Sequence, residues 1–120
     1  MANILIVDDS ASMRQMIKFT LEAGGLNIDE ATDGLQGLGL AQRNQYDAVI
    51  SDINMPNMDG IEMTQKIRTL PNYKFTPILL LTTESAGDKK AEGRSAGATG
   101  WLVKPFNPDQ LTKIVNKVLK

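Results

Sequence analysis

The sequence predicts an α/β protein in which a doubly wound, parallel, five-stranded sheet lies between two layers of helices. Short apolar runs that are continuous rather than alternating indicate strands buried on both faces of a parallel sheet. These runs are residues 4–7, 48–50, 78–81 and 101–103. Segments with helical spacing separate the runs, and right-handed crossovers place such helices on both faces of the sheet.

A fifth strand is predicted over residues 26–31, where apolar and polar residues alternate. This pattern is typical of an edge strand with one wetter face. The length of 120 residues predicts one domain over residues 1–120.

The helices follow in order. The first begins at Ser10 and ends at Gly24-Gly25, because glycine commonly ends helices. Its predicted buried residues are Met13, Ile17, Phe19 and Leu21. The second buries Leu35, Leu38 and Ala41, and is weakened by Gly37 and Gly39.

The third helix is predicted to bury Ile61, Met63, Ile67 and Leu70 and to end at Pro71. Residues 85–97 carry only alanine and glycine as apolar residues, which indicates a lightly packed helix. The last helix has the strongest start signal, with Asn107 as N-cap and Pro108 at its first position.

The composition excludes several kinds of chemistry. Without cysteine or histidine, the chain has no disulfide, thiolate nucleophile, imidazole base or histidine metal ligand. The balance of 13 basic and 14 acidic residues argues against a nucleic-acid partner. No apolar run approaches the ~20 residues of a membrane span, and no signal peptide opens the chain, so we expect a cytoplasmic protein.

The residues that directly follow the strands are candidates for a site, because ligands bind outside the carboxyl ends of such strands. They are Asp8, Asp9, Asp52, Thr82 and Lys104. Taken alone, the Asp8-Asp9 pair indicates a helix N-cap, Thr82 a strand end and Lys104 a solvated charge. Taken together, three converging carboxylates would repel one another by ~4 kcal/mol per pair at ~4 Å. A bound cation or a proton stabilises such a cluster.

Oxygen ligands in an open, partly hydrated site favour Mg²⁺, for which Mn²⁺ can substitute. A divalent cation beside a carboxylate, a hydroxyl and a lysine is suited to phosphoryl transfer. One carboxylate can attack phosphorus and form an aspartyl phosphate. The strand-end residues therefore predict a phosphoryl-transfer site.

Four segments carry a resemblance to a known family: ILIVDD at residues 4–9, DINMPNMDG at 52–60, LTT at 81–83 and VKPF at 103–106. In this order they resemble the receiver domains of two-component response regulators, over essentially the whole chain. The resemblance implies a flavodoxin-like (βα)5 fold with strand order 2-1-3-4-5. It also implies a cis bond between Lys104 and Pro105.

The resemblance implies a role for each site residue. Asp52 would accept the phosphoryl group, and Asp8, Asp9, Asp52 and the backbone carbonyl of Asn54 would hold Mg²⁺. Lys104 would pair with the phosphoryl group, while Thr82 and Trp101 would form the switch. Asn54 and Glu84 would modulate the rate of hydrolysis. Gly60 would relieve a backbone constraint in the loop after Asp52.

Stand-alone receivers that this chain resembles act most often in chemotaxis. The implied partners are a histidine kinase of the CheA type, a phosphatase, and the flagellar motor switch protein or another target that binds the phosphorylated form. The protein is expected to be a monomer that promotes only its own phosphorylation and dephosphorylation. Lys89, Lys90 and Arg94 lie on the helix that relatives use for output, although a solvated basic helix explains them equally well.

Position 101 departs from the family pattern, in which the aromatic residue three before the lysine is typically Tyr or Phe. Trp101 has a larger ring and no phenolic hydroxyl, a departure that leaves phosphorylation untouched and bears on motor binding. We expect the indole to turn inward from water when the protein is phosphorylated.

Four alternatives to a motor-binding receiver remain. A phosphate sink or a phosphorelay intermediate would use the same residues without binding the motor. A phosphatase of the haloacid-dehalogenase type would carry a second aspartate two positions after its nucleophile, where this chain has Ser10 after Asp8. A flavin-binding module would need a phosphate-binding turn after the first strand, where two carboxylates would repel a phosphate.

Overall fold

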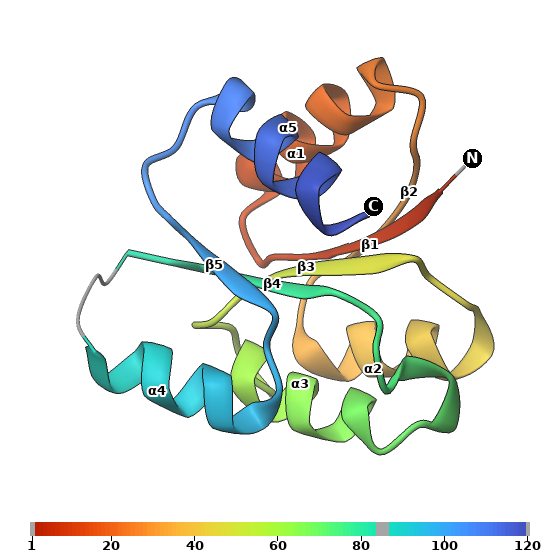
Figure 1. The fold of residues 1–120 in the computed structure, drawn as a ribbon, viewed down its shortest axis with the longest axis vertical. Helices are drawn as coiled ribbons and strands as arrows, with labels where there is room; N and C mark the ends of the chain where they lie inside the picture. Colours follow the sequence, from red (N-terminus) through yellow and green to blue (C-terminus); the bar gives the residue numbers. More distant parts are fainter. Residues whose placement is uncertain (1, 84–86, 120) are drawn as a thin grey trace.

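The computed structural model describes residues 2–83 and 87–119, with only the backbone of residues 87–89, and forms an α/β sandwich (Figure 1). Its parallel strands are β1 (Asn3–Val7), β2 (Asn27–Ala31), β3 (Ala48–Asp52), β4 (Ile78–Thr82) and β5 (Gly100–Val103), in the order β2-β1-β3-β4-β5. The helices are α1 (Ala11–Ala23), α2 (Gly34–Arg43), α3 (Gly60–Arg68), α4 (Gly87–Ala96) and α5 (Pro108–Val118), with a 3-10 turn η1 (Pro71–Tyr73). The predicted fold class and strand order are confirmed.

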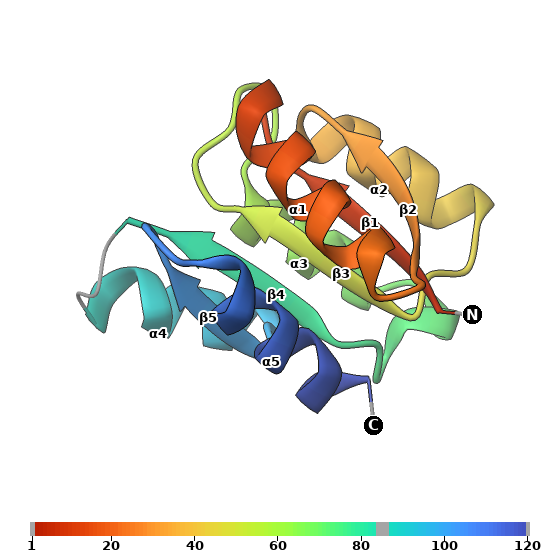
Figure 2. The same cartoon turned by 90° about the horizontal axis from the view of Figure 1, so that it is seen from above.

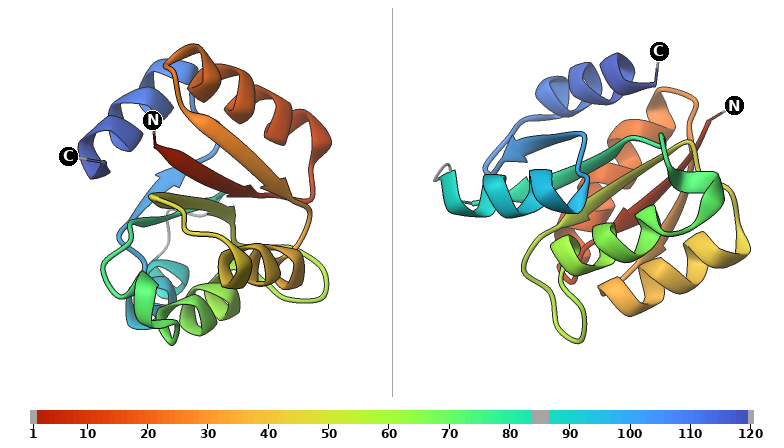
Figure 3. Two further views of the ribbon diagram at one scale, coloured as in Figure 1. Left: turned by 90° about the vertical axis from the view of Figure 1, so that its right-hand side faces the viewer. Right: turned by 60° about the horizontal axis from the view of Figure 1, so that its bottom comes forward.

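The helices form two layers on opposite faces of the sheet (Figures 1 and 3). Helices α1 and α5 lie side by side over one face (Figure 2), and α2, α3 and α4 cover the other. Successive residues of β1 point to opposite layers: Ile6 packs in the cluster with Ile17 of α1, and Val7 in the cluster with Met63 of α3. The continuous apolar runs therefore fill two cores at once.

Strand β2 lies at the edge of the sheet, as predicted, but its burial does not alternate, because the adjacent residues Asp29 and Glu30 are both exposed. Asn27, Asp29 and Glu30 are exposed, and Ala31 is buried. None of the described helices has the length and apolar character that a membrane-spanning helix needs.

Two predicted buried residues are exposed. Phe19 is 79% exposed and Leu35 is 54% exposed. Helix α2 instead buries Gly34, Gly37 and Ala41. A Cβ at Gly37 would lie 2.7 Å from the sulfur of Met63 on α3 and 2.9 Å from Val7 Cγ2 on β1, so this glycine lets α2 lie close to both α3 and the sheet.

Helix α4 packs lightly, as predicted, with Gly93 and Ala96 among its buried residues. Its carboxyl end is fixed by Arg68, whose Nε and one terminal nitrogen donate to the Gly97 carbonyl at 3.0 and 2.8 Å. The other terminal nitrogen donates to the carbonyls of Tyr73 and Thr76. Arg68 thus joins the segment after α3 to the end of α4.

Candidate functional site

The carboxylates predicted to converge lie together at the carboxyl ends of the two central strands. Strands β1 and β3 are neighbours in register, with Val7 opposite Ser51, so Asp8 and Asp52 follow at the same level. One carboxylate oxygen each from Asp8, Asp9 and Asp52 lies within 4.8 Å of the others. Asp8 is fully buried, Asp52 is partly buried and Asp9 is exposed.

The turn after β1 fixes Asp8 by both its side chain and its backbone. The Ser10 N–H donates to Asp8 Oδ1 at 2.9 Å, and Arg14 donates to the Asp8 carbonyl oxygen at 2.6 Å. The N-cap of α1 is Ser10, whose hydroxyl accepts from the Met13 N–H, so neither aspartate serves as the cap. Sequence reasoning missed Arg14, because a basic residue in the first turns of a helix is usually a surface residue.

Lys104 reaches both buried carboxylates. Its Nζ lies 3.3 Å from Asp52 Oδ2 and 3.5 Å from Asp8 Oδ2, and its side chain is 16% exposed. The Lys104 N–H donates to the Thr82 carbonyl at 2.7 Å, and the predicted cis bond to Pro105 is present. The ammonium therefore offsets part of the repulsion between the two acids, a contact that the sequence did not predict.

The electrostatics of the pair still favour additional positive charge. Burial raises the pKa of Asp52; the nearby Asp8 carboxylate also raises it, while Lys104 and the Ile53 N–H lower it. Asp8 Oδ2 is buried and makes no hydrogen bond to any described residue. A buried carboxylate oxygen that accepts no hydrogen bond from the described residues, within reach of two further carboxylates, fits a hard divalent cation.

The loop after β3 requires glycine at position 60, and the backbone constraint that this glycine relieves is a close approach. A Cβ at Gly60 would lie 2.2 Å from the Asp52 carbonyl oxygen, so close approach excludes every other residue. Gly60 is not among the residues with positive φ; in this loop that conformation belongs to Asn57, at 68°. Asn54, the predicted carbonyl ligand, lies at the start of this loop and is exposed.

Thr82 and Trp101 lie on neighbouring strands β4 and β5. Thr82 is buried and pairs in register with Val103. Trp101 is half-buried rather than in water, because Gly93 of α4 leaves room for it; the indole Cζ2 and Nε1 lie 3.2 Å from where a Cβ at Gly93 would be. The expectation of a water-exposed indole is therefore wrong for this structure.

The output helix is described in part. The Arg94 guanidinium lies 5.5 Å from the Trp101 ring centre, and Lys90 is half-buried. Glu84 and the side chain of Lys89 lie outside the described residues.

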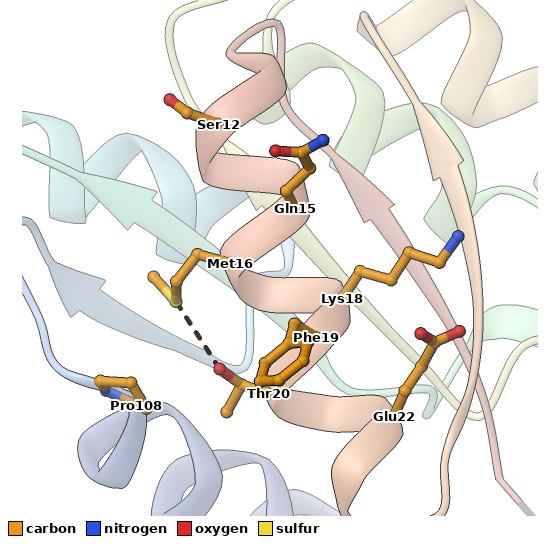
Figure 4. A pocket seen from close by; sticks show the side chains of 8 residues that line it. All are labelled: Ser12, Gln15, Met16, Lys18, Phe19, Thr20, Glu22 and Pro108. Atoms are coloured by element: carbon orange, nitrogen blue, oxygen red, sulfur yellow. Dashed lines mark hydrogen bonds between the residues drawn. The ribbon is translucent and has the colours of Figure 1, made fainter.

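A groove of about 620 Å³ lies on α1 beside the start of α5 (Figure 4). It is lined by Ser12, Gln15, Met16, Lys18, Phe19, Thr20, Glu22 and Pro108. None of the acidic residues of the site lines it, so it is a separate surface feature.

Residues 4–116 match the model of the response regulator receiver domain. The chain belongs to this family. Among curated relatives, the receiver is 37% identical to chemotaxis protein CheY-3 of Vibrio cholerae, over 98% of this chain and 91% of the relative. It is also 37% identical to the transcriptional regulatory protein SrrA of Staphylococcus aureus, over 98% of this chain and 47% of that protein.

Solved structures agree with these relatives. The receiver superimposes on the chemotaxis response regulator CheY4 of Vibrio cholerae with a TM-score of 0.95, at 52% identity over 98% of each chain. The receiver domain of sensor histidine kinase PA1611 from Pseudomonas aeruginosa, with a magnesium ion coordinated in its active site cleft, gives a TM-score of 0.92 at 30% identity over 98% of this chain and 97% of that one. The protein is thus a CheY-like receiver of two-component signalling, a signalling protein rather than a classical enzyme. The family match favours a receiver over a phosphatase or a flavin-binding module.

Proposed function

We propose that this receiver accepts a phosphoryl group on Asp52 from a histidine kinase of the CheA type, in a reaction that depends on Mg²⁺ or Mn²⁺. The observation that carries the proposal is the position of Asp52, at the end of β3, within 4.8 Å of two other aspartates and 3.3 Å from the Lys104 ammonium. Residues 1–120 would act as one cytoplasmic, monomeric receiver domain without a nucleic-acid partner.

In the proposed reaction, an Asp52 carboxylate oxygen attacks phosphorus. A new O–P bond forms, the bond from phosphorus to the nitrogen of the kinase phosphohistidine breaks, and the electron pair leaves with that nitrogen. Asp8, Asp9, Asp52 and the Asn54 carbonyl would hold the metal, which when bound stabilises charge on the phosphoryl oxygens. Lys104 would pair with a phosphoryl oxygen, since its ammonium already lies beside Asp52.

The phosphoryl group would then bias the face formed by α4, β5 and α5. The Thr82 hydroxyl would donate to a phosphoryl oxygen, and Trp101 would change its packing under α4. Asn54 and Glu84 would set the rate of hydrolysis, and a phosphatase could accelerate it.

The names of the relatives favour a role in chemotaxis, because two of them are called chemotaxis protein CheY-3 and chemotaxis response regulator CheY4. Binding of the phosphorylated form to a flagellar motor switch protein is the direct test. If wild type and Thr82→Ala, both carrying phosphate, fail equally to bind it, the receiver is instead a phosphate sink or a phosphorelay intermediate.

Phosphorylation is tested by the intact mass of the protein after incubation with acetyl phosphate and Mg²⁺. We expect a phosphoryl adduct on the wild type and on Asp109→Asn, a control on the exposed first turn of α5. We expect none on Asp52→Asn, because the amide nitrogen and oxygen are poor nucleophiles. An equal adduct on Asp52→Asn would overturn the assignment.

A further inference from the structure

Hydrogen bonds hold the loop from Ile53 to Asp59 both at its base and at its far end. At its base the Gly60 N–H donates to the Ile53 carbonyl at 2.9 Å. At its far end it contacts the turn between β2 and α2, a distant part of the sequence.

Two hydrogen bonds make this distant contact. Asn57 Nδ2 donates to Asp33 Oδ2 at 2.7 Å, and the Gly34 N–H donates to the Met58 carbonyl at 3.0 Å. A Cβ at Gly34 would lie 2.4 Å from that carbonyl oxygen, so the two segments touch backbone to backbone. The Met58 side chain is buried in the core below them.

Asp33 is itself fixed. It is 7% exposed, and its Oδ1 accepts the Gln36 N–H at 2.9 Å as the N-cap of α2. One carboxylate oxygen thus caps a helix, while the other holds Asn57. A carboxylate used in both ways has a defined orientation, and so does the amide bonded to it.

Asn57 is also in a conformation that glycine adopts more easily, with φ of 68°. An asparagine at this position is explained by its side chain, which reaches Asp33. The pair therefore contributes something that glycine would not.

We propose that Asp33 and Asn57 form a latch that positions the 53–59 loop, and with it the Asn54 carbonyl, for metal binding beside Asp52. The inference rests on the proposed function. A backbone ligand on a loose loop must be ordered when the metal binds, and a preformed latch removes that cost. Asp33 and Asn57 are positioning residues, since neither belongs to the predicted ligands.

The test compares Asn57→Gly with wild type. Glycine keeps the backbone conformation and removes the amide. We expect the Mg²⁺ dissociation constant, measured by calorimetry well below the melting temperature, to rise about tenfold. With acetyl phosphate, the Mg²⁺ concentration for half-maximal phosphorylation should rise similarly, while the rate at saturating Mg²⁺ stays within about twofold of wild type.

A second variant, Asn57→Asp, places a carboxylate against Asp33 and should weaken Mg²⁺ binding at least as much. Tyr46→Phe is the matched control, at a position just before β3. It removes the hydroxyl that donates a hydrogen bond to Asp29, and it should lower stability without changing Mg²⁺ affinity. The latch is overturned if both Asn57 variants bind Mg²⁺ like wild type, or weaken only as much as Tyr46→Phe. If wild type itself neither binds Mg²⁺ nor carries phosphate on Asp52, the proposed function fails and the latch fails with it.

Discussion

Asp8 illustrates how few partners the site provides for its charges. One of its oxygens accepts the Ser10 N–H, and the other is buried 3.5 Å from the Lys104 ammonium. Asp52 shares the same ammonium. The Lys104 ammonium thus faces two carboxylates at a site partly shielded from solvent, which agrees with the raised pKa of Asp52.

Asp8→Asn is expected to stabilise the protein without metal. Replacing one of three clustered acids relieves repulsion between like charges, and because Lys104 already offsets part of that repulsion we expect a net gain of about 1 kcal/mol. The melting temperature in the presence of a chelator should rise by about 4 °C. Mg²⁺ affinity, measured by calorimetry, should fall, because a charged ligand is lost.

Asp109→Asn controls for the change in net charge. It should leave Mg²⁺ affinity unchanged and lower the melting temperature slightly, because it removes a favourable charge from the first turn of α5. A lower melting temperature for metal-free Asp8→Asn would show that the ion pair with Lys104 outweighs the repulsion between the acids.

At this scale the sequence predicts which residues converge but not how they contact one another. Asp8, Asp9 and Asp52 could be placed because each lies at the carboxyl end of a buried strand or within two residues of it. The bridging position of Lys104 and the bond from Arg14 depend on side-chain conformations chosen in the folded protein. The latch between Asp33 and Asn57 joins two loops, and no periodic pattern reports contacts between loops.

The packing of α4 against β5 depends on a match between the sizes of their facing residues. Trp101 fits under α4 because Gly93 has no side chain, and Arg94 lies over the ring. The indole Nε1 is buried and has no hydrogen-bond partner among the described residues. Its position is therefore set by packing rather than by a polar contact.

Gly93→Ala is expected to push the indole outward. The new Cβ would lie 2.9 Å from Leu80 Cδ1 and 3.2 Å from the indole, and overpacking of this kind costs about 1–3 kcal/mol. We expect a red-shifted emission and stronger quenching by iodide. Trp101 is the one tryptophan of the chain, so the signal comes from this position.

Gly39→Ala is the matched control in α2, where the nearest atom to a new Cβ is the end of the Arg43 side chain at 3.6 Å. It should raise stability by up to about 1 kcal/mol, from helix propensity, and leave the emission unchanged. If Gly93→Ala behaves like Gly39→Ala, the indole does not pack against position 93.

Glycine also explains one error in the predicted buried residues. Large apolar residues are usually assigned to the buried face of a helix, which places Leu35 inside, although it is exposed. In α2 the buried face consists of glycine and alanine, because the helix lies close to Val7 and Met63. Hydrophobic periodicity does not detect a helix face that is buried because its side chains are small.

For the whole molecule, the cation site should couple to global stability. The site draws on β1, β3 and β5, so a ligand that binds it stabilises only the assembled sheet. Mg²⁺ at 100 times its dissociation constant should add about 2.7 kcal/mol, which corresponds to a rise in melting temperature of roughly 10 °C.

The measurement is a pair of thermal melts with Mg²⁺ and with a chelator, at equal ionic strength adjusted with NaCl. Screening by salt then contributes equally to both. Asp8→Asn should show a smaller Mg²⁺-dependent shift. Identical melting temperatures for the wild type in the two conditions would contradict a cation site.

Lys104 follows the last strand of the chain, and this order has a consequence for biosynthesis. A nascent chain that has left the ribosome only through β4 already contains both Asp8 and Asp52, whose strands are neighbours at the centre of the sheet. It lacks the ammonium that lies between them in the finished protein. Pairing of β5 with β4 delivers that charge, so translation of β5 both completes the sheet and offsets part of the repulsion between the two acids.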